Sequence, residues 1–251
     1  MKHYRAVFID WDDTIGDFHG AAKKALQEMY DKYHLCNYFA SHEEFISLYK
    51  PHNIELWDKY GKDLVSKEYL SFDRFFYPLM HGSKVCERLS YDKVLRMDLC
   101  ALAERLSEDF LHMTTAHFAL LEGAEEIVRY LAAKYPLTVV TNGFVEVQYE
   151  KFEKSGLKDC FAHIVLSEEV GCQKPNPQIM HVAIEKNKQQ LPDLQPSEVI
   201  MIGDSFSSDI AGANATGIDT IWLAQSDNIT DEQRKVATHI VTSLQEIKQI
   251  L

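Results

Sequence analysis

The second half of the chain alternates between short apolar runs, which are typical of buried strands, and segments with a helical spacing of apolar residues. Strands separated by helices indicate a parallel sheet covered on both faces, because parallel neighbours need a long crossover connection. The expected strands are 137–141, 163–166, 199–202, 220–223 and 239–241, and the expected helices are 124–134, 144–155, 177–186, 208–216 and 244–251. We therefore expect an α/β fold with a Rossmann-like parallel sheet.

One further strand stands apart from this alternating region, near the N-terminus. A strand is expected at 4–9, where residues 6–9 form an apolar run of the same kind, whereas residues 20–117 read as helical with no convincing strand. The helical block is therefore an insertion between the first and second strands. We expect a core at 1–16 and 119–251 and a helical cap domain at 17–118. Open α/β sheets bind ligands at the carboxyl ends of their strands, so we expect the insertion above that edge.

Composition limits the partners of the chain. A formal net charge of −12 argues against nucleic-acid polymers, which bind basic surfaces. No apolar run is long enough to cross a bilayer, and the N-terminus does not resemble a signal peptide, so we expect no membrane partner. Cysteines without close pairing indicate reduced thiols in a cytoplasmic protein, and they are Cys36, Cys86, Cys100, Cys160 and Cys172.

Two aspartates follow the first strand directly, in the segment Asp10-Trp11-Asp12-Asp13-Thr14. Asp10 and Asp12 lie on the same side of an extended segment, because side chains alternate along a strand. One carboxylate can attack phosphorus and form an aspartyl-phosphate, and the other can protonate the leaving oxygen and later deprotonate water. The alternative is a polar loop in which Asp13 and Thr14 cap the next helix.

A second acidic segment, Gly203-Asp204-Ser205 with Asp209, follows the strand expected at 199–202. Four carboxylates in one pocket need compensation, because two charges about 4 Å apart repel by roughly 4 kcal/mol at an effective dielectric of 20. A hard cation relieves this repulsion, and all-oxygen ligands favour Mg²⁺ over zinc. The expected metal-binding residues are Asp10, Asp12 through its carbonyl oxygen, Asp204, and Asp209 behind the direct ligands. Taken alone, Asp209 is also a reasonable charge at a helix N-terminus.

Two further segments provide groups that can bind phosphate. Thr141 offers a hydroxyl and, with Asn142 and Gly143, backbone N–H groups at the entry to a helix. Lys174 lies in a loop kept rigid by prolines and can offset negative charge on a phosphoryl group. The alternatives are a helix N-cap at Thr141 and a solvated surface lysine. The sequence has no His-Glu-x-x-His motif, no nucleophile elbow and no Walker A motif.

These four segments, in this order, resemble the motifs of the haloacid dehalogenase (HAD) superfamily of phosphohydrolases, and the resemblance covers essentially the whole chain. The roles that it implies by matching position are nucleophile for Asp10, general acid/base for Asp12, second-motif hydroxyl for Thr141, third-motif lysine for Lys174, and fourth-motif acids for Asp204 and Asp209. It also implies a HAD-like core and a cap of the C1 class where the helical insertion occurs.

A narrower resemblance is to bacterial pyrimidine 5′-nucleotidases, which remove phosphate from nucleoside monophosphates. The similar segments are Thr141-Asn142-Gly143-Phe144, Ser167-Glu168-Glu169-Val170-Gly171 and Trp222-Leu223, with Leu56-Trp57, Tyr60-Gly61 and Arg74-Phe75 in the cap. Trp57 and Arg74 are either substrate contacts or parts of the cap core, with Arg74 in a structural ion pair. The departures are Trp11, where an aliphatic residue is usual, and Glu122 before Gly123, where proline is common.

We therefore expect a Mg²⁺-dependent phosphomonoesterase that acts through an aspartyl-phosphate on small phosphate esters, above all nucleoside 5′-monophosphates, as a monomer or homodimer. A phosphosugar phosphatase or mutase of the same superfamily is the first alternative. A dehalogenase needs neither the metal nor the second aspartate, so Asp12 and Asp204 count against it. A signalling module that accepts phosphate on Asp10 is disfavoured by the large insertion, and a non-catalytic binding protein by the filled catalytic positions.

Overall fold

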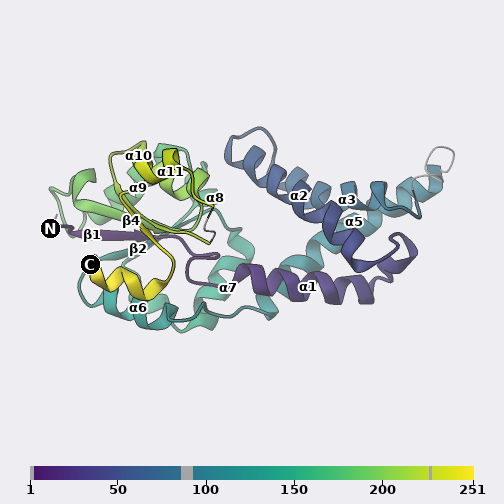
Figure 1. Cartoon of the computed structure of the whole chain (residues 1–251), viewed down its shortest axis with the longest axis horizontal. Coiled ribbons are helices and arrows are strands. Elements are labelled where there is room, and N and C mark those ends of the chain that lie inside the picture. The colour runs from purple at the N-terminus through teal and green to yellow at the C-terminus, as the bar shows by residue number, and fades with distance from the viewer. Residues whose placement is uncertain (1–2, 86–92, 226–227) are drawn as a thin grey trace. The chain divides into compact units, whose positions relative to one another are not determined.

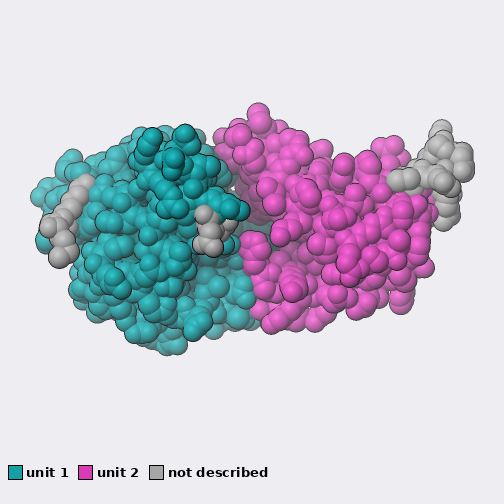
Figure 2. Space-filling model, viewed as in Figure 1, with its two compact units in different colours: residues 1–18, 118–251 teal, residues 19–117 magenta. Residues whose placement is uncertain are grey.

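A computed structural model describes residues 3–85, 93–225 and 228–251. The chain divides into two compact units, one made of Met1–Phe18 with Phe118–Leu251 and the other of His19–His117 (Figure 2). The first unit contains the sheet. Cys86 lies outside the described residues, and the described cysteines form no disulfide with one another: Cys36, Cys100, Cys160 and Cys172.

Parallel strands form one six-stranded sheet with the order β3-β2-β1-β4-β5-β6 (Figure 1). The strands are β1 Ala6–Ile9, β2 Leu137–Thr141, β3 His163–Leu166, β4 Val199–Gly203, β5 Asp219–Leu223 and β6 His239–Val241. This confirms the expected α/β fold with a Rossmann-like parallel sheet. Each strand expected from the apolar runs coincides or nearly coincides with an observed one.

Helices connect these strands. In the first unit they are α6 Ala124–Ala132, α7 Val145–Ser155, α8 Ser167–Val170, α9 Pro177–Asn187, α10 Ala211–Asn214 and α11 Asp231–Val236, with 3-10 turns at Lys158–Cys160 and Pro196–Glu198. The helix expected at 208–216 is instead a π-helical turn, Phe206–Ile210, followed by α10. The segment expected as a helix at 244–251 is a 3-10 helix, Leu244–Gln249, with i→i+3 hydrogen bonds.

The sheet is buried on both faces, and β1 shows this residue by residue. Val7 and Ile9 belong to an apolar cluster with residues of α6, whereas Ala6 and Phe8 belong to a second cluster with residues of α9 and α10. Figure 1 shows α6 on one side of the sheet and α9 with α10 on the other. A strand covered on both sides has no polar face, which explains the continuous apolar run.

The second unit is helical throughout its described residues. Its elements are α1 Phe18–Lys32, which begins at the last residue of the first unit's opening segment, a 3-10 turn Leu35–Asn37, α2 His42–Gly61, α3 Lys67–His81 and α5 Lys93–Ala116. Ser41 and Ser66 begin α2 and α3 as N-caps, because each side chain accepts a hydrogen bond from a backbone N–H of the first turn. Within the described parts of the chain, no helix is both long enough and apolar enough to cross a membrane.

Candidate active site

The predicted site segments meet at one edge of the sheet. β1 lies between β2 and β4, so the strand order changes direction at β1. In open α/β sheets such a switch point leaves a crevice at the carboxyl ends of the strands. Asp10 follows β1, Thr141 ends β2 and Asp204 follows β4. Three of the four motifs are therefore brought together by the strand order alone.

Lys174, from the third motif, forms two buried ion pairs. Its Nζ lies 2.5 Å from an Asp10 oxygen and 2.6 Å from an Asp209 oxygen, and it donates a hydrogen bond to the Val140 carbonyl at 2.6 Å. Burial favours the neutral amine, but the carboxylates of Asp10 and Asp209 outweigh it and raise the pKa of Lys174. With 2% of its surface exposed, Lys174 is a charged group inside the pocket and not a solvated surface lysine.

Asp204 is held by hydrogen bonds from two directions. The Thr14 hydroxyl accepts from the Asp204 N–H at 3.1 Å and donates to its carboxylate at 3.3 Å. The Trp222 indole donates to the Asp204 carbonyl at 2.8 Å. Thr14 is fully buried and α1 begins only at Phe18, so the Thr14 side chain does not cap that helix, which the sequence left open as an alternative.

Asp209 reaches Lys174 through the π-helical turn. The Ser205 carbonyl accepts hydrogen bonds from both the Asp209 and the Ile210 N–H groups, at 2.9 and 3.3 Å, which widens the turn. The Asp209 carboxylate in turn accepts from the Ser205 N–H at 3.0 Å. It lies over Gly203, where an added Cβ would be 2.3 Å from an Asp209 oxygen. A side chain at position 203 would therefore displace Asp209.

The acidic groups outnumber the cation between them. Carboxylate oxygens of Asp10, Asp204 and Asp209 all lie within 4.8 Å of one another. Burial and the neighbouring carboxylates raise the pKa of Asp10 and of Asp204, although Lys174 acts in the opposite direction. One ammonium cannot neutralise three ionised carboxylates, so the pocket favours either bound protons or an additional cation. Ligand atoms that are all oxygen suit a hard divalent cation such as Mg²⁺.

The segment after β2 places the predicted phosphate-binding residues beside Lys174. The Asn142 side chain donates to the Lys174 carbonyl at 2.9 Å and accepts from the Lys174 N–H at 2.8 Å. The Thr141 hydroxyl accepts from the Gly143 N–H and from Gln148 Nε2, both at 3.1 Å. Because these donors use both lone pairs, the hydroxyl proton of Thr141 points elsewhere and can be donated to an anion.

Asp12 contacts α7. Lys151 Nζ lies 2.9 Å from one carboxylate oxygen of Asp12, and Gln148 Nε2 lies 2.8 Å from the other. The Asp12 carboxylate is not part of the group formed by Asp10, Asp204 and Asp209. The predicted contribution of Asp12 to a metal site is accordingly its carbonyl oxygen and not its side chain.

Comparison with known proteins identifies the family that has these motifs. A family model for the haloacid dehalogenase-like hydrolases matches residues 4–217. The chain belongs to this family. The finding confirms the resemblance that the four motifs indicated.

Individual HAD hydrolases are similar to the chain over almost its whole length. The pyrimidine 5′-nucleotidase YjjG of Escherichia coli is 28% identical, and the match covers 98% of this chain and 96% of YjjG. The pyrimidine 5′-nucleotidase PynA of Streptococcus pneumoniae is also 28% identical, with 99% and 95% covered. The crystal structure of the HAD-hydrolase YfnB from Bacillus subtilis, bound to magnesium, matches with a TM-score of 0.80 at 27% identity, with 100% and 99% covered.

The residues that hydrogen-bond to Asp12 and Asp204 were not identified from the sequence: Thr14, Gln148, Lys151 and Trp222. A signal existed for two of them, because Gln148 and Lys151 lie three residues apart in the helix expected directly after the second motif. From the sequence, Thr14 is considered only as a helix cap and Trp222 only as part of a similar segment, and nothing local in the sequence indicates that either residue contacts Asp204. Their contacts with Asp204 depend on β1, β4 and β5 being neighbours in the sheet.

Trp11, the main departure from the family pattern, is accommodated by aromatic packing. Its side chain is fully buried, stacks on Phe118 with ring centroids 5.9 Å apart, and meets the Phe152 ring edge-on at 4.6 Å. Trp11 therefore points away from the acidic groups and into the core cluster that contains Ile9. The larger side chain is thus accommodated in the core, outside the acidic group of Asp10, Asp204 and Asp209.

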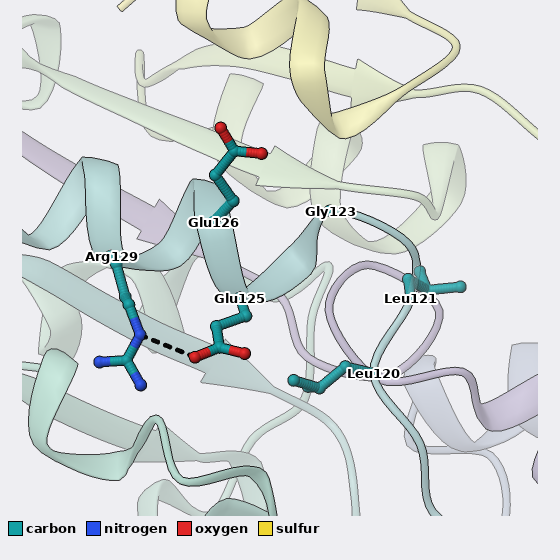
Figure 3. A pocket seen from close by; sticks show the side chains of 6 residues that line it. All are labelled: Leu120, Leu121, Gly123, Glu125, Glu126 and Arg129. Carbon is teal, nitrogen blue, oxygen red and sulfur yellow. Dashed lines mark hydrogen bonds and ion pairs between the residues drawn. The ribbon is translucent and has the colours of Figure 1, made fainter.

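A hollow lies on the first unit at the start of α6 (Figure 3). Its lining residues are Leu120, Leu121, Gly123, Glu125, Glu126 and Arg129. The charged groups there are already paired, since Arg129 donates to Glu125 at 2.9 Å and Lys248 contacts Glu126. No predicted site residue lines this hollow, so the chemistry is assigned to the carboxyl edge of the sheet.

Proposed function

We propose that this HAD hydrolase is a Mg²⁺-dependent phosphomonoester hydrolase that acts on nucleoside 5′-monophosphates, with pyrimidine nucleotides foremost. The observation that carries the proposal is the cluster of Asp10, Asp204 and Asp209, in which Asp10 and Asp209 pair with the buried Lys174. A carboxylate beside a buried ammonium suits nucleophilic attack on an anionic phosphoryl group. The excess of carboxylates suits a bound divalent cation.

In the proposed reaction, an Asp10 oxygen attacks phosphorus and the bond to the ester oxygen breaks. Asp12 gives its proton to that leaving oxygen, so the nucleoside departs as an alcohol and the phosphoryl group remains on Asp10. Asp12, now a carboxylate, then takes a proton from the water that attacks phosphorus. The bond between Asp10 and phosphorus breaks, which releases inorganic phosphate and restores both aspartates.

Lys174 and Thr141 are proposed to stabilise the charge that develops on the phosphoryl oxygens. Lys174 is already desolvated, so its positive charge acts with little screening by water. Asn142 holds the Lys174 backbone through its two side-chain hydrogen bonds. The Thr141 hydroxyl and the Asn142 and Gly143 backbone N–H groups form the proposed phosphate-binding segment.

Asp10 and Asp204 would hold Mg²⁺ directly, together with the Asp12 carbonyl oxygen. Both Asp209 oxygens already have partners in Lys174 and Ser205, which supports a place for Asp209 behind the direct ligands. When bound, the ion supplies positive charge that offsets the carboxylates and the phosphoryl oxygens. The magnesium-bound structure of the similar protein YfnB supports the choice of metal.

The substrate class rests on similarity to YjjG and PynA, which are pyrimidine 5′-nucleotidases. We further propose that residues 1–16 and 119–251 form the catalytic core and that residues 17–118 form a C1 cap. The division of the chain into compact units at Phe18 and Phe118 supports these boundaries. A cap of this kind supplies contacts to the leaving group and excludes water during the reaction.

A phosphate-release assay tests the proposal. We expect hydrolysis of pyrimidine nucleoside monophosphates to be faster than that of sugar phosphates, and activity to disappear in EDTA and return with Mg²⁺. Asp10→Asn should lower kcat by about 1,000-fold or more, because it removes the attacking group. Circular dichroism of that variant checks that the fold is retained.

Other outcomes would point to the alternatives. Faster hydrolysis of sugar phosphates would favour a phosphosugar phosphatase, and activity that survives EDTA would contradict the metal requirement. A stable phosphoaspartate without steady phosphate release would indicate a signalling module. Full activity of a correctly folded Asp10→Asn variant would reject Asp10 as the nucleophile.

A further inference from the structure

The Asp12 carboxylate is held at both oxygens by side chains of α7. Lys151 binds one oxygen at 2.9 Å and Gln148 binds the other at 2.8 Å. Gln148 is fully buried and the Lys151 side chain is 4% exposed, whereas the Asp12 side chain is 24% exposed. Two donors from the interior thus reach outward to one partly exposed carboxylate. This arrangement leaves Asp12 little freedom to change its rotamer.

The chain around Gln148 is shaped to allow this contact. Gln148 and Lys151 are three residues apart on α7 and therefore lie on one face of the helix. An added Cβ on Gly143 would lie 1.7 Å from Gln148 Nε2 and 2.9 Å from an Asp12 oxygen. Glycine at position 143 thus leaves the space in which the Gln148 amide meets both Asp12 and Thr141.

A purely structural role explains these contacts poorly. Burying a lysine costs several kcal/mol, and a partly exposed aspartate can be solvated by water without it. The Gln148 Oε1 is buried and has no hydrogen-bond partner among the described residues, which is a further cost. The amide is oriented by its NH₂ end, because only that end can donate to a carboxylate. Polar groups buried at such a cost are expected where orientation matters.

We propose that Lys151 and Gln148 are positioning residues for Asp12, which they hold in the rotamer that serves both proton transfers. The proposal rests on the proposed function, in which Asp12 is the general acid and base. Both residues contact Asp12 and act through it. Small displacements of a reacting group cost rate steeply, so loss of either contact lowers kcat more than it changes KM.

The test is a double-mutant cycle with Lys151→Met and Asp12→Asn, measured as kcat and KM for the best nucleotide with Mg²⁺. Lys151→Met is expected to lower kcat by about 10- to 100-fold with KM within about twofold, and Lys151→Arg to recover part of the loss. In the Asp12→Asn background, Lys151→Met should cause no further loss, because its effect passes through Asp12. Lys154→Met, which removes an exposed lysine of the same helix paired with Glu150, is the matched control and should behave as wild type.

The results that would contradict the inference can be distinguished from one another. If Asp12→Asn lowers kcat and Lys151→Met does not, the positioning role is wrong and the proposed function stands. Losses that multiply in the double variant mean that Lys151 acts independently of Asp12. Full activity of Asp12→Asn would reject the role of Asp12 and with it both proposals. Gln148→Leu provides a second test should Lys151→Met fail to fold: it should also lower kcat, and because Gln148 donates to Thr141 as well, part of its effect should persist in the Asp12→Asn background.

Discussion

At the scale of single residues, two glycines leave the space that other side chains occupy at the candidate site. A Cβ on Gly143 would overlap the Gln148 amide, and a Cβ on Gly203 would overlap the Asp209 carboxylate. Neither glycine has a positive φ, so both positions require space and not an unusual backbone conformation. The two cases differ in what must move, since the end of the Gln148 side chain is flexible and the Asp209 Cβ is not.

Gly203→Ala should therefore strongly lower both the stability of the fold and the enzymatic activity. The new methyl group would lie 2.5 Å from the Asp209 Cβ, which side-chain rotation cannot relieve. We expect the free energy of unfolding to fall by about 1–3 kcal/mol, as for other overpacked cores, and phosphatase activity to fall at least about tenfold as Asp209 leaves Lys174. Urea denaturation and phosphate release measure the two effects. Ser207→Ala, at an exposed position of the same turn, is the control, and equal behaviour of the two variants would contradict this account.

At the scale of secondary-structure elements, α3 carries a buried charge that has no acidic partner among the residues the structure describes. Arg74 is 1% exposed, and its guanidinium carbon lies 4.7 Å from the centroid of the Phe110 ring on α5. Among the described residues no carboxylate pairs with Arg74, and its Nε and one terminal nitrogen are buried without hydrogen bonds. Burial lowers the pKa of Arg74. The structural ion pair considered from the sequence is thus not found among these residues.

Arg74→Met should leave the protein equally stable or make it more stable. An aromatic neighbour is worth up to about 2 kcal/mol to a desolvated cation, whereas burying the charge costs several kcal/mol. Replacement of buried charges by apolar side chains of similar size is often neutral or stabilising by about 1–4 kcal/mol. Urea denaturation in the absence of ligands measures the change. Destabilisation by more than about 1 kcal/mol would show that the guanidinium contributes more than packing.

At the scale of the whole molecule, the acidic cluster couples folding to pH and to cations. The pKa values of Asp10 and Asp204 are raised above the ordinary 3.8, with burial as the largest cause. Between the ordinary and the raised values the folded protein binds more protons than the unfolded chain, so stability falls as pH rises through that range. A divalent cation competes with those protons and should bind better as they leave.

The thermal shift caused by Mg²⁺ should therefore grow with pH. We expect a larger increase of Tm on adding Mg²⁺ at pH 8 than at pH 5, because Asp10, whose pKa is raised to about 7, is ionised at pH 8 and fewer protons then compete with the cation. Differential scanning fluorimetry at the two pH values measures this difference. Asp204→Asn removes one of the two carboxyl groups with a raised pKa, so it should reduce the difference between the Tm increases at the two pH values. A shift of equal size at both pH values, or no shift at all, would contradict a metal site at this cluster.

Much of the fold could be predicted because its signals are local. The runs before Asp10 and Asp204 are short and apolar without interruption, which is typical of a strand buried on both faces, and the polar motifs mark where those strands end. The π-helical turn could not be predicted in the same way. Its form depends on the Asp209 carboxylate turning back to Ser205 and to Lys174, which is far away in the sequence.

The sequence by itself determined the parallel sheet, the insertion and the order of the motifs, because strand and helix patterns depend on residues that are close together in the sequence. Only the tertiary structure decided which groups surround each aspartate. Lys151 and Asp12 are 139 residues apart, and Thr14 and Asp204 are 190 apart, so each contact exists only because the strand order brings β1 beside β2 and β4. Local patterns specify elements, whereas the environment of a carboxylate depends on long-range packing.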